Sequence, residues 1–315
     1  IGLAGVGGTV SGVGIITAPH IKTGGTANNT GLGRDVLAAV TTGSYNVALG
    51  SYALDANTAG NSNTGVGYQA LTALTTASNS TAVGENALAG NTTGGNNTAI
   101  GAQTLTTNTT GTNNVALGYN SLNDNTTASG NTSLGYNAMA LNTTGNYNVA
   151  VGNLALDAST TADGNTAVGD QTLTSTTTGV NNVALGRQAI SVNTTGSNNT
   201  AVGAYALDAN TTASNNTALG YNTLGSNTTG ANNSAVGMYA LDANTTGANN
   251  TAVGYSALSD HTTTNDNTAV GYFAMRYNTT GAQNTAIGKG ALQTNTTASY
   301  NTAVGDQALL DNTTG

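Results

Sequence analysis

Apolar residues recur along the chain in short bursts at a fixed spacing of 17 residues. Each period carries one burst centred on Ala-Val and a second on Ala-Leu, and the remainder is mostly Asn, Thr and Gly. The series begins at Asn29 and continues at every seventeenth residue to Asn301, with Ser80 as the one start that is not Asn. Seventeen copies of N-T-A-V-G-x-x-A-L-x-x-N-T-T-G-x-N, the last short by two residues, therefore fill residues 29–315, after a Gly-rich irregular leader or degenerate coil at 1–28.

This period is unsuited to a helix. Asn, Thr and Gly are poor helix formers, and 17 residues at 100° each would turn the apolar stripe by about 100° from one copy to the next. Short bursts of Thr, Val and Leu between Gly and Asn at a rigid period are typical of a parallel β-solenoid. The sequence therefore predicts an all-β protein, a β-roll or β-helix of 17-residue coils. With coils about 4.8 Å apart, the rod would be roughly 80 Å long.

Residues 250–266 illustrate one predicted coil, and its positions are numbered 1 to 17 below. A strand is expected over N-T-A-V-G and a second short strand over x-A-L. Because side chains alternate along a strand, we expect Val253 at position 4 and Leu258 at position 9 to point inward together. Gly254, at a position that is Gly in all seventeen copies, is expected at a corner where a positive φ or a close backbone approach excludes a Cβ.

Polar residues at fixed positions predict hydrogen-bonded ladders between coils. Asn250 represents position 1, and Asn also dominates position 12. Stacked asparagines can bond to one another and to turn backbone. Thr262 belongs to position 13, which is Thr in every copy, and we expect an unbroken ladder there.

The predicted core is thin, because each coil supplies only two large apolar side chains. Burial of one such side chain contributes about 1.5–3 kcal/mol, against about 1–2 kcal/mol of backbone entropy for each ordered residue. Position 3 faces away from position 4 and is Ala in fourteen copies. We therefore expect this row of alanines to pack against other chains in a parallel homotrimer. The alternative is that Ala merely fits a tight coil. The small residues at position 8 belong either to the same surface or to the interior.

Composition narrows the possible partners. Charged residues make up 6% of the chain, against about 25% in ordinary globular proteins, and 13 acids outnumber 5 bases. That balance disfavours nucleic acid and anionic lipid as partners. The absence of Cys excludes a disulfide scaffold and thiolate metal sites. No apolar run approaches the roughly 18 residues needed to span a bilayer, so no membrane insertion is expected.

The sequence offers little catalytic chemistry. Asp208 and Asp242 share position 10, but they stand two coils apart, about 9–10 Å by the ladder spacing, which is too far for one metal ion or a carboxylate dyad. His261 occupies position 12, where Val40 and Leu74 also occur, so it is interpreted as a tolerated substitution rather than a site. We predict that the protein is not an enzyme and has no cofactor and no metal site.

Aromatic residues concentrate on the variable positions that should form the outer face. Nine of the thirteen Tyr residues fall at position 6 or 7. Exposed aromatic rings can stack on sugars or anchor a protein partner, although they can also simply cover coil edges. The densest cluster is the candidate contact surface: Tyr239, Tyr255, Tyr272, Phe273 and Tyr277.

The strand motif carries a family resemblance. The segments N-V-A-L-G at 46–50 and 114–118 and N-V-A-V-G at 148–152 resemble the S-V-A-I-G-type head repeats of trimeric autotransporter adhesins. That resemblance implies trimers of left-handed parallel β-rolls. The full N-T-A-V-G…N-T-T-G unit also resembles repeat regions of phage tail fibres and related bacterial surface fibres. The present repeat is longer than that of the adhesin heads, so a three-sided solenoid of a single chain is a further alternative.

These observations predict a structural or adhesive extracellular fibre, located at a cell surface or on a virion. It would be a tail-fibre, surface-adhesin or filament shaft that supplies a rigid rod and surface attachment. Its expected partners are its own copies, in a trimer and in end-to-end filaments, together with a cell-surface glycan or protein. The alternative is a glycan-binding module that uses the Tyr face. A lesser one is an ice-binding solenoid, although the neighbouring Thr262 and Thr263 should diverge rather than share a flat face.

Overall fold

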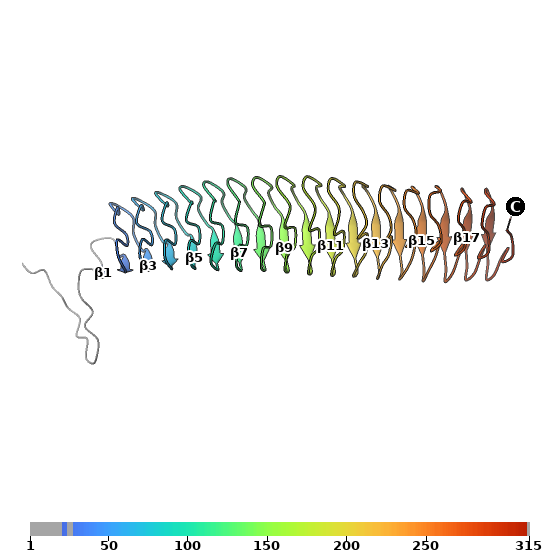
Figure 1. Cartoon of the computed structure of the whole chain (residues 1–315), viewed down its shortest axis with the longest axis horizontal. Helices are drawn as coiled ribbons and strands as arrows, with labels where there is room; N and C mark the ends of the chain where they lie inside the picture. The colour runs from blue at the N-terminus through green and yellow to red at the C-terminus, as the bar shows by residue number, and fades with distance from the viewer. Residues whose placement is uncertain (1–20, 24–27, 314–315) are drawn as a thin grey trace, which may run out of the picture.

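The computed structural model describes residues 21–23 and 28–313 of the chain. Its coils stack into one elongated rod (Figure 1). Within the described residues there are eighteen strands of three residues each. Their bounds are β1 Ile21–Thr23, β2 Thr30–Leu32, β3 Val47–Leu49, β4 Thr64–Val66, β5 Thr81–Val83, β6 Thr98–Ile100, β7 Val115–Leu117, β8 Thr132–Leu134, β9 Val149–Val151, β10 Thr166–Val168, β11 Val183–Leu185, β12 Thr200–Val202, β13 Thr217–Leu219, β14 Ser234–Val236, β15 Thr251–Val253, β16 Thr268–Val270, β17 Thr285–Ile287 and β18 Thr302–Val304.

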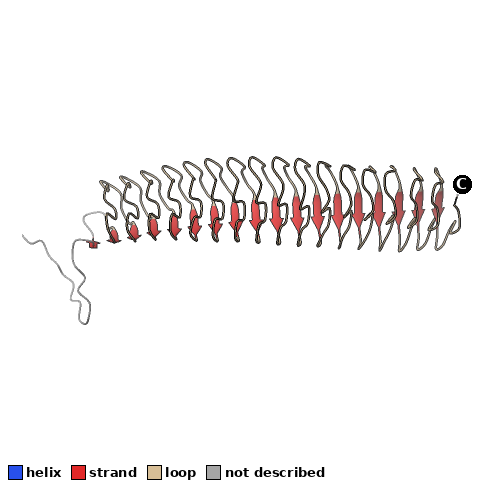
Figure 2. Ribbon diagram, in the orientation of Figure 1, coloured by secondary structure: helices blue, strands red, loops and turns tan. Residues whose placement is uncertain are grey.

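From β2 to β18, every strand pairs in parallel with the strand of the next coil. The register is one whole repeat, so that Ala252 lies opposite Ala269. The strands form one sheet along a single side of the rod, and turns make up the rest of each coil (Figure 2). The prediction of a parallel β-solenoid is therefore confirmed. Most of the leader expected at 1–28 lies outside the described residues, but β1 pairs antiparallel with β2.

The predicted second strand at x-A-L is absent, and positions 6 to 11 of each coil form turns instead. In the coil at 250–266 the turn contains two residues with positive φ, Ser256 at 49° and Leu258 at 52°. A third lies just before the coil, where Asn249 has a φ of 59°. The left-handed region costs most residues roughly 1–2 kcal/mol, but Asn tolerates it. The frequent Asn at position 17, and the Asn in four copies at position 7, therefore suit this backbone geometry, which reverses the chain within a few residues.

The interior contains the small residues of the strand and the leucine of the turn. Ala252, Ala257 and Leu258 are all fully buried. The prediction that position 9 points inward is confirmed, whereas the prediction that position 3 packs against another chain is wrong. The tight turn brings position 9 close to the inner side of the strand: a Cβ built on Gly65, at position 3, would lie 3.5 Å from Leu54 of the preceding coil. Only a small side chain fits there, as the alternative interpretation of the alanines proposed.

The strand therefore faces the opposite way from the prediction. Val253 was expected inside, but 37% of its surface is exposed. The same outward position is still more exposed in Leu219, at 45%, and Ile287, at 43%. Position 2, usually Thr or Val, shares this side because it is two residues away on the same strand. These outward residues of β2–β18, at positions 2 and 4, are called the outer strand face below.

Gly254 occupies the predicted corner. Its φ is 134°, and an added Cβ would lie 2.4 Å from the carbonyl oxygen of Gly271 in the next coil. Both reasons for requiring Gly apply at once, since the backbone conformation disfavours a side chain and the neighbouring coil leaves no space for one. The corner prediction is confirmed.

The Asn ladders also form as predicted. The Asn250 side-chain oxygen accepts a hydrogen bond from the Asn267 amide at 3.0 Å, and its Nδ2 donates to the Thr264 carbonyl at 2.9 Å. At position 12, Asn244 Nδ2 donates to Asn227 Oδ1 at 2.9 Å and to the Gly247 carbonyl at 3.0 Å. These side chains are completely buried, so their hydrogen bonds fill the role that apolar packing has in an ordinary core.

The Thr ladder has one interruption. The Thr245 hydroxyl donates to the Thr262 carbonyl at 3.0 Å, and the same bond recurs from Thr279 to Thr296 at 3.1 Å. Between Thr262 and Thr279, however, neither the hydroxyl nor the amide makes this bond among the described residues. The expectation of an unbroken ladder through Thr262 is therefore wrong. At this step Thr264 replaces the usual Gly or Ala, and its hydroxyl donates to the Gly281 carbonyl at 3.0 Å.

Candidate functional site: the tyrosine array and its pocket

Four of the five predicted contact residues form one continuous aromatic surface. The ring centroids of Tyr239 and Tyr255 are 6.2 Å apart, and those of Tyr255 and Tyr272 are 5.5 Å apart and stacked. Phe273 lies 5.6 Å from Tyr255 and 4.0 Å from Tyr272. These side chains meet because positions 6 and 7 of successive coils lie above one another, at a spacing that suits ring contact.

Two further tyrosines extend this surface toward the N-terminus. Tyr221 lies 5.7 Å from Tyr239, and Tyr205 lies 5.8 Å from Tyr221. Both stand at position 6 or 7, like most of the predicted residues, but they lie outside the predicted cluster. The tyrosine array, as we call it, thus runs over Tyr205, Tyr221, Tyr239, Tyr255, Tyr272 and Phe273.

The fifth predicted residue, Tyr277, makes no ring contact with the array within the described structure. It is connected through Arg276, whose guanidinium carbon lies 4.3 Å from the Phe273 ring centroid and 5.1 Å from that of Tyr277. Such cation–π contacts hold a guanidinium against aromatic faces. Arg276 is thereby fixed at the edge of the array, where the sequence analysis did not place a functional group.

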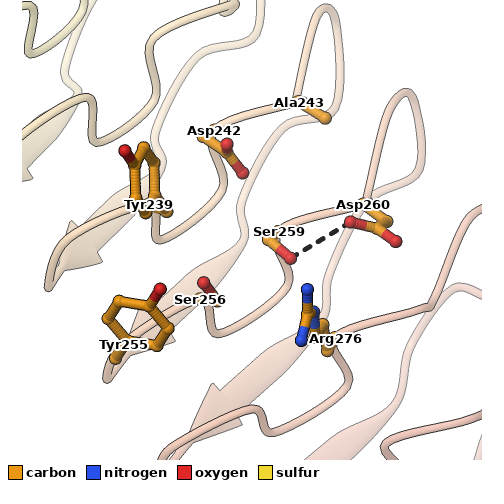
Figure 3. A pocket seen from close by; sticks show the side chains of 8 residues that line it. All are labelled: Tyr239, Asp242, Ala243, Tyr255, Ser256, Ser259, Asp260 and Arg276. Carbon is orange, nitrogen blue, oxygen red and sulfur yellow. Dashed lines mark hydrogen bonds between the residues drawn. The ribbon is translucent and has the colours of Figure 1, made fainter.

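A surface pocket of about 320 Å³ opens beside the array. It spans three coils, and Figure 3 shows the Tyr239 and Tyr255 rings on one side, the acidic side chains on the other, and Arg276 rising from the next coil. The lining residues are Tyr239, Asp242, Ala243, Tyr255, Ser256, Ser259, Asp260 and Arg276. Its volume falls at the small end of the range usual for ligand pockets.

The pocket contains polar groups with hydrogen-bonding capacity to spare. Ser256 and Ser259 are each only 6% exposed. The Ser259 hydroxyl donates to Asp260 Oδ1 at 3.2 Å, whereas the Ser256 hydroxyl makes no hydrogen bond with any described residue. The Nε atom of Arg276 is buried and also has no partner among the described residues. Buried polar groups are usually satisfied, so Arg276 Nε is an exception that calls for an explanation, whereas the Ser256 hydroxyl is free to bond a molecule in the pocket.

The pocket is acidic. The pKa of Asp242 is raised to about 6, chiefly by burial and also by the nearby Asp260 carboxylate, while backbone hydrogen bonds and Arg276 act in the opposite direction. Burial also raises the pKa values of Asp157 and Asp208, which occupy the same repeat position. Asp242 differs from those two in having both a second carboxylate and a guanidinium nearby.

This arrangement corrects the sequence view of the acids. Asp242 was compared with Asp208 because they share position 10, but its relevant neighbour is Asp260, at position 11 of the next coil. The sequence does mark this part of the rod through two rare residues. Arg at position 10 and Tyr at position 11 each occur in one copy, at Arg276 and Tyr277. Within the described residues, no group of three or more His, Cys, Asp or Glu side chains is placed to hold a metal ion.

His261 lies in the interior and takes the place of the ladder asparagine. It is fully buried, and its Nε2 is 2.7 Å from the Thr264 carbonyl oxygen, the same kind of acceptor that Asn244 uses. A carbonyl can only accept, so Nε2 carries the proton. Burial lowers the pKa of His261, and the hydrogen bond to Thr264 partly opposes this effect. The neutral ring therefore acts as a substitute for Asn.

No protein-family model matches the chain, and no curated protein matches its sequence. Across the described coils, no helix is both long enough and apolar enough to cross a bilayer. What the chain does is therefore inferred from its own two distinctive surfaces, the outer strand face and the tyrosine array.

Proposed function

We propose that the chain is the shaft of an extracellular fibre, at a cell surface or on a virion, in which parallel copies associate through their outer strand faces. The observation that supports this proposal is the exposure of Val, Leu or Ile at position 4 along β2–β18. An unbroken parallel ladder supplies the stiffness of a rod, and an apolar face along its length supplies a reason for copies to assemble.

The size of the outer strand face suits such an interface. Seventeen coils at about 4.8 Å and a strand of three residues at about 3.3 Å each outline roughly 80 by 10 Å, or about 800 Å². The aliphatic row at position 4 is one part of this outline, and the other is the row at position 2, which is Thr in twelve of the seventeen copies. A stable complex typically buries about 800 Å² on each partner.

The resemblance to trimeric head repeats favours an assembly of three parallel copies. The corrected orientation of the strand supports self-association from a different surface than the sequence suggested: the alanines of position 3 fill each coil, and the bulkier residues of position 4 are free to pack between chains. A pair of chains that meet face to face is the alternative number.

Ice binding is the alternative function of the same face. Thr at position 2 stands beside an aliphatic residue at position 4, and the coils repeat this pair at a regular spacing, which could order water as an ice-binding surface does. Position 4, however, varies among Val, Leu and Ile, so the face is uneven in height. Unequal side chains suit interdigitation between protein surfaces better than they match a uniform lattice. We therefore favour assembly over ice binding.

Light scattering of the purified chain tests the proposal. A chain mass of 30.7 kDa predicts three times that value, about 92 kDa, for the trimer. The Leu219→Asp variant places a charge in the middle of the face and should shift the mass toward that of one chain. Thr229→Asp, at an exposed turn position, is the matched control and should keep the wild-type mass. A wild-type mass of one chain with a folded β spectrum would contradict the proposal.

A further inference from the structure

Five residues that are unique at their repeat positions fall in one short stretch. Arg276 is the only Arg at position 10, Phe273 is the only Phe in the chain, and Thr264 is the only Thr at position 15. Together with His261 and Tyr277 they fall within residues 261–277. A uniform rod requires none of these substitutions, because the other coils stack without them. Of these residues, Arg276 lines the pocket, and Phe273 and Tyr277 contact its guanidinium, which indicates that this part of the rod has a function of its own.

The pocket offers complementary hydrogen-bonding groups at short range. Carboxylates only accept, a guanidinium only donates, and a serine hydroxyl does both. The Ser256 hydroxyl lines the pocket with no partner among the described residues, and Arg276 Nε is buried and unpaired. A ligand rich in hydroxyl groups could satisfy donors and acceptors alike, since each hydroxyl can also donate and accept.

The aromatic side of the pocket also suits a ligand rich in hydroxyl groups. Tyr255 is 40% exposed, so part of its ring is available to a ligand, and its neighbours continue the surface along the rod. Tyrosine combines an apolar ring face with a polar tip. Such a surface fits a pyranose ring, which has a face of C–H groups and a rim of hydroxyls.

The charge of the pocket favours a neutral ligand over an acidic one. Asp242 and Asp260 give the pocket two potential negative charges against the single positive charge of Arg276. The chain as a whole carries a net charge of −8. An anionic sugar or a phosphate would therefore meet repulsion both at the pocket and at long range.

We propose that the pocket formed by Tyr239, Asp242, Tyr255, Ser256, Asp260 and Arg276 binds one pyranose unit of a neutral polysaccharide, whose flanking units lie along the tyrosine array. The carboxylates accept hydrogen bonds from sugar hydroxyls, Arg276 and Ser256 donate to sugar oxygens, and Tyr255 packs on the ring face. This binding function goes beyond the shaft function, and it does not depend on how many chains assemble.

Affinity electrophoresis of the full chain through gels that contain dextran, mannan, galactan or xylan tests the proposal, with polygalacturonate as an anionic probe. At least one neutral polymer should retard the chain, and polygalacturonate should not. Tyr255→Ala and Arg276→Ala should each weaken the binding to that polymer about tenfold. Neither variant should change the mass measured by light scattering, which separates loss of binding from loss of assembly or fold.

The repeat supplies matched controls. Tyr119→Ala removes an exposed tyrosine that stacks on Tyr136 at 5.8 Å, in coils that lack an arginine. Asp208→Asn changes the repeat equivalent of Asp242 outside the pocket. Both should bind like the wild type. The proposal would be overturned by a lack of binding to every neutral polymer, by binding to polygalacturonate alone, or by equal losses in Tyr119→Ala and Tyr255→Ala.

Discussion

Coils 199–249 and coils 250–283 share one backbone and differ in what they carry. In the first group, position 12 is Asn throughout and the Thr ladder runs without a gap. In the second, His261 and Thr264 interrupt both patterns, and Arg276 and Phe273 appear on the outside. The strand pairing nevertheless continues through the change, with β15 on β16 and β16 on β17 in the same register.

This comparison separates the requirements of the fold from those of the surface. The strand, the Gly corner and the buried leucine position are kept in both groups of coils, so they determine the coil. The N-T-T-G turn tolerates disturbance, and positions 6, 7, 10 and 11 are free to vary. The solenoid can therefore carry a local site on one side without loss of its stacking.

The largest effect should come from a change at the corner that both groups share. Gly254→Ala adds a Cβ that would meet the Gly271 carbonyl oxygen at 2.4 Å, at a φ of 134°. Backbone strain and overpacking each cost about 1–3 kcal/mol, so we expect a loss of about 2–6 kcal/mol in the free energy of unfolding. Denaturant unfolding followed by circular dichroism measures it.

Gly290→Asn is the control for that change. Gly290 has a φ of 63° at position 7, where four other copies carry Asn, and the nearest atom to an added Cβ is the flexible end of Gln293 at 3.1 Å. Its effect should stay below about 1 kcal/mol, because Asn tolerates the left-handed region. Equal losses in the two variants would show that the corner is not a special position.

A second substitution pair tests which side of the strand is inside. Leu258 is fully buried and Val253 is 37% exposed. Leu258→Ala should lower the free energy of unfolding by about 2–5 kcal/mol, as expected for a cavity in a core. Val253→Ala should change it by much less in a dissociated chain and should act mainly on assembly. If Val253→Ala proved as destabilising as Leu258→Ala in single chains, the outward orientation of position 4 would be wrong.

The smallest expected effect concerns the coil that breaks the Asn pattern. Burial lowers the pKa of His261 in the folded chain, so below about pH 6.5 the unfolded chain binds more protons than the folded one. Stability should therefore fall as the pH drops through that region. His261→Asn restores the usual ladder residue and should make this decline shallower. Unfolding midpoints at pH 7.5 and 5.0 measure the difference, and identical declines in both proteins would argue against a buried neutral histidine.

The period, the parallel stacking, the Gly corner and the Asn ladders were predictable because each depends on residue type at a fixed spacing. The inward side of the strand was not, because alternation defines two faces without saying which one is enclosed. Hydrophobicity favoured Val253 over Ala252, yet the interior has room only for a methyl group. One pair of residues does indicate the enclosed face: Ser133, at position 3, is matched by Ser121, at position 8 of the preceding coil, and their hydroxyls are 2.7 Å apart inside the rod.

The candidate site was predictable only in part, for a related reason. Tyr239, Tyr255, Tyr272 and Phe273 could be grouped because they share positions 6 and 7. The contribution of Asp260 and Arg276 depends on a turn that carries positions 10 and 11 alongside position 7 of neighbouring coils. That turn is built from residues of positive φ such as Leu258, and a leucine gives little indication of such a conformation.

The central claim, that copies meet through their outer strand faces in parallel, is tested most directly by distances between spin labels. The chain has no native cysteine, so Val253→Cys introduces one label site for each chain, and Thr246→Cys places a control label on an exposed turn. Packed sheets lie about 10 Å apart, so labels at 253 should show inter-chain distances of about 10–20 Å. Labels at 246 should be much farther apart. The absence of inter-chain coupling at 253, or short distances at 246 instead, would contradict the account.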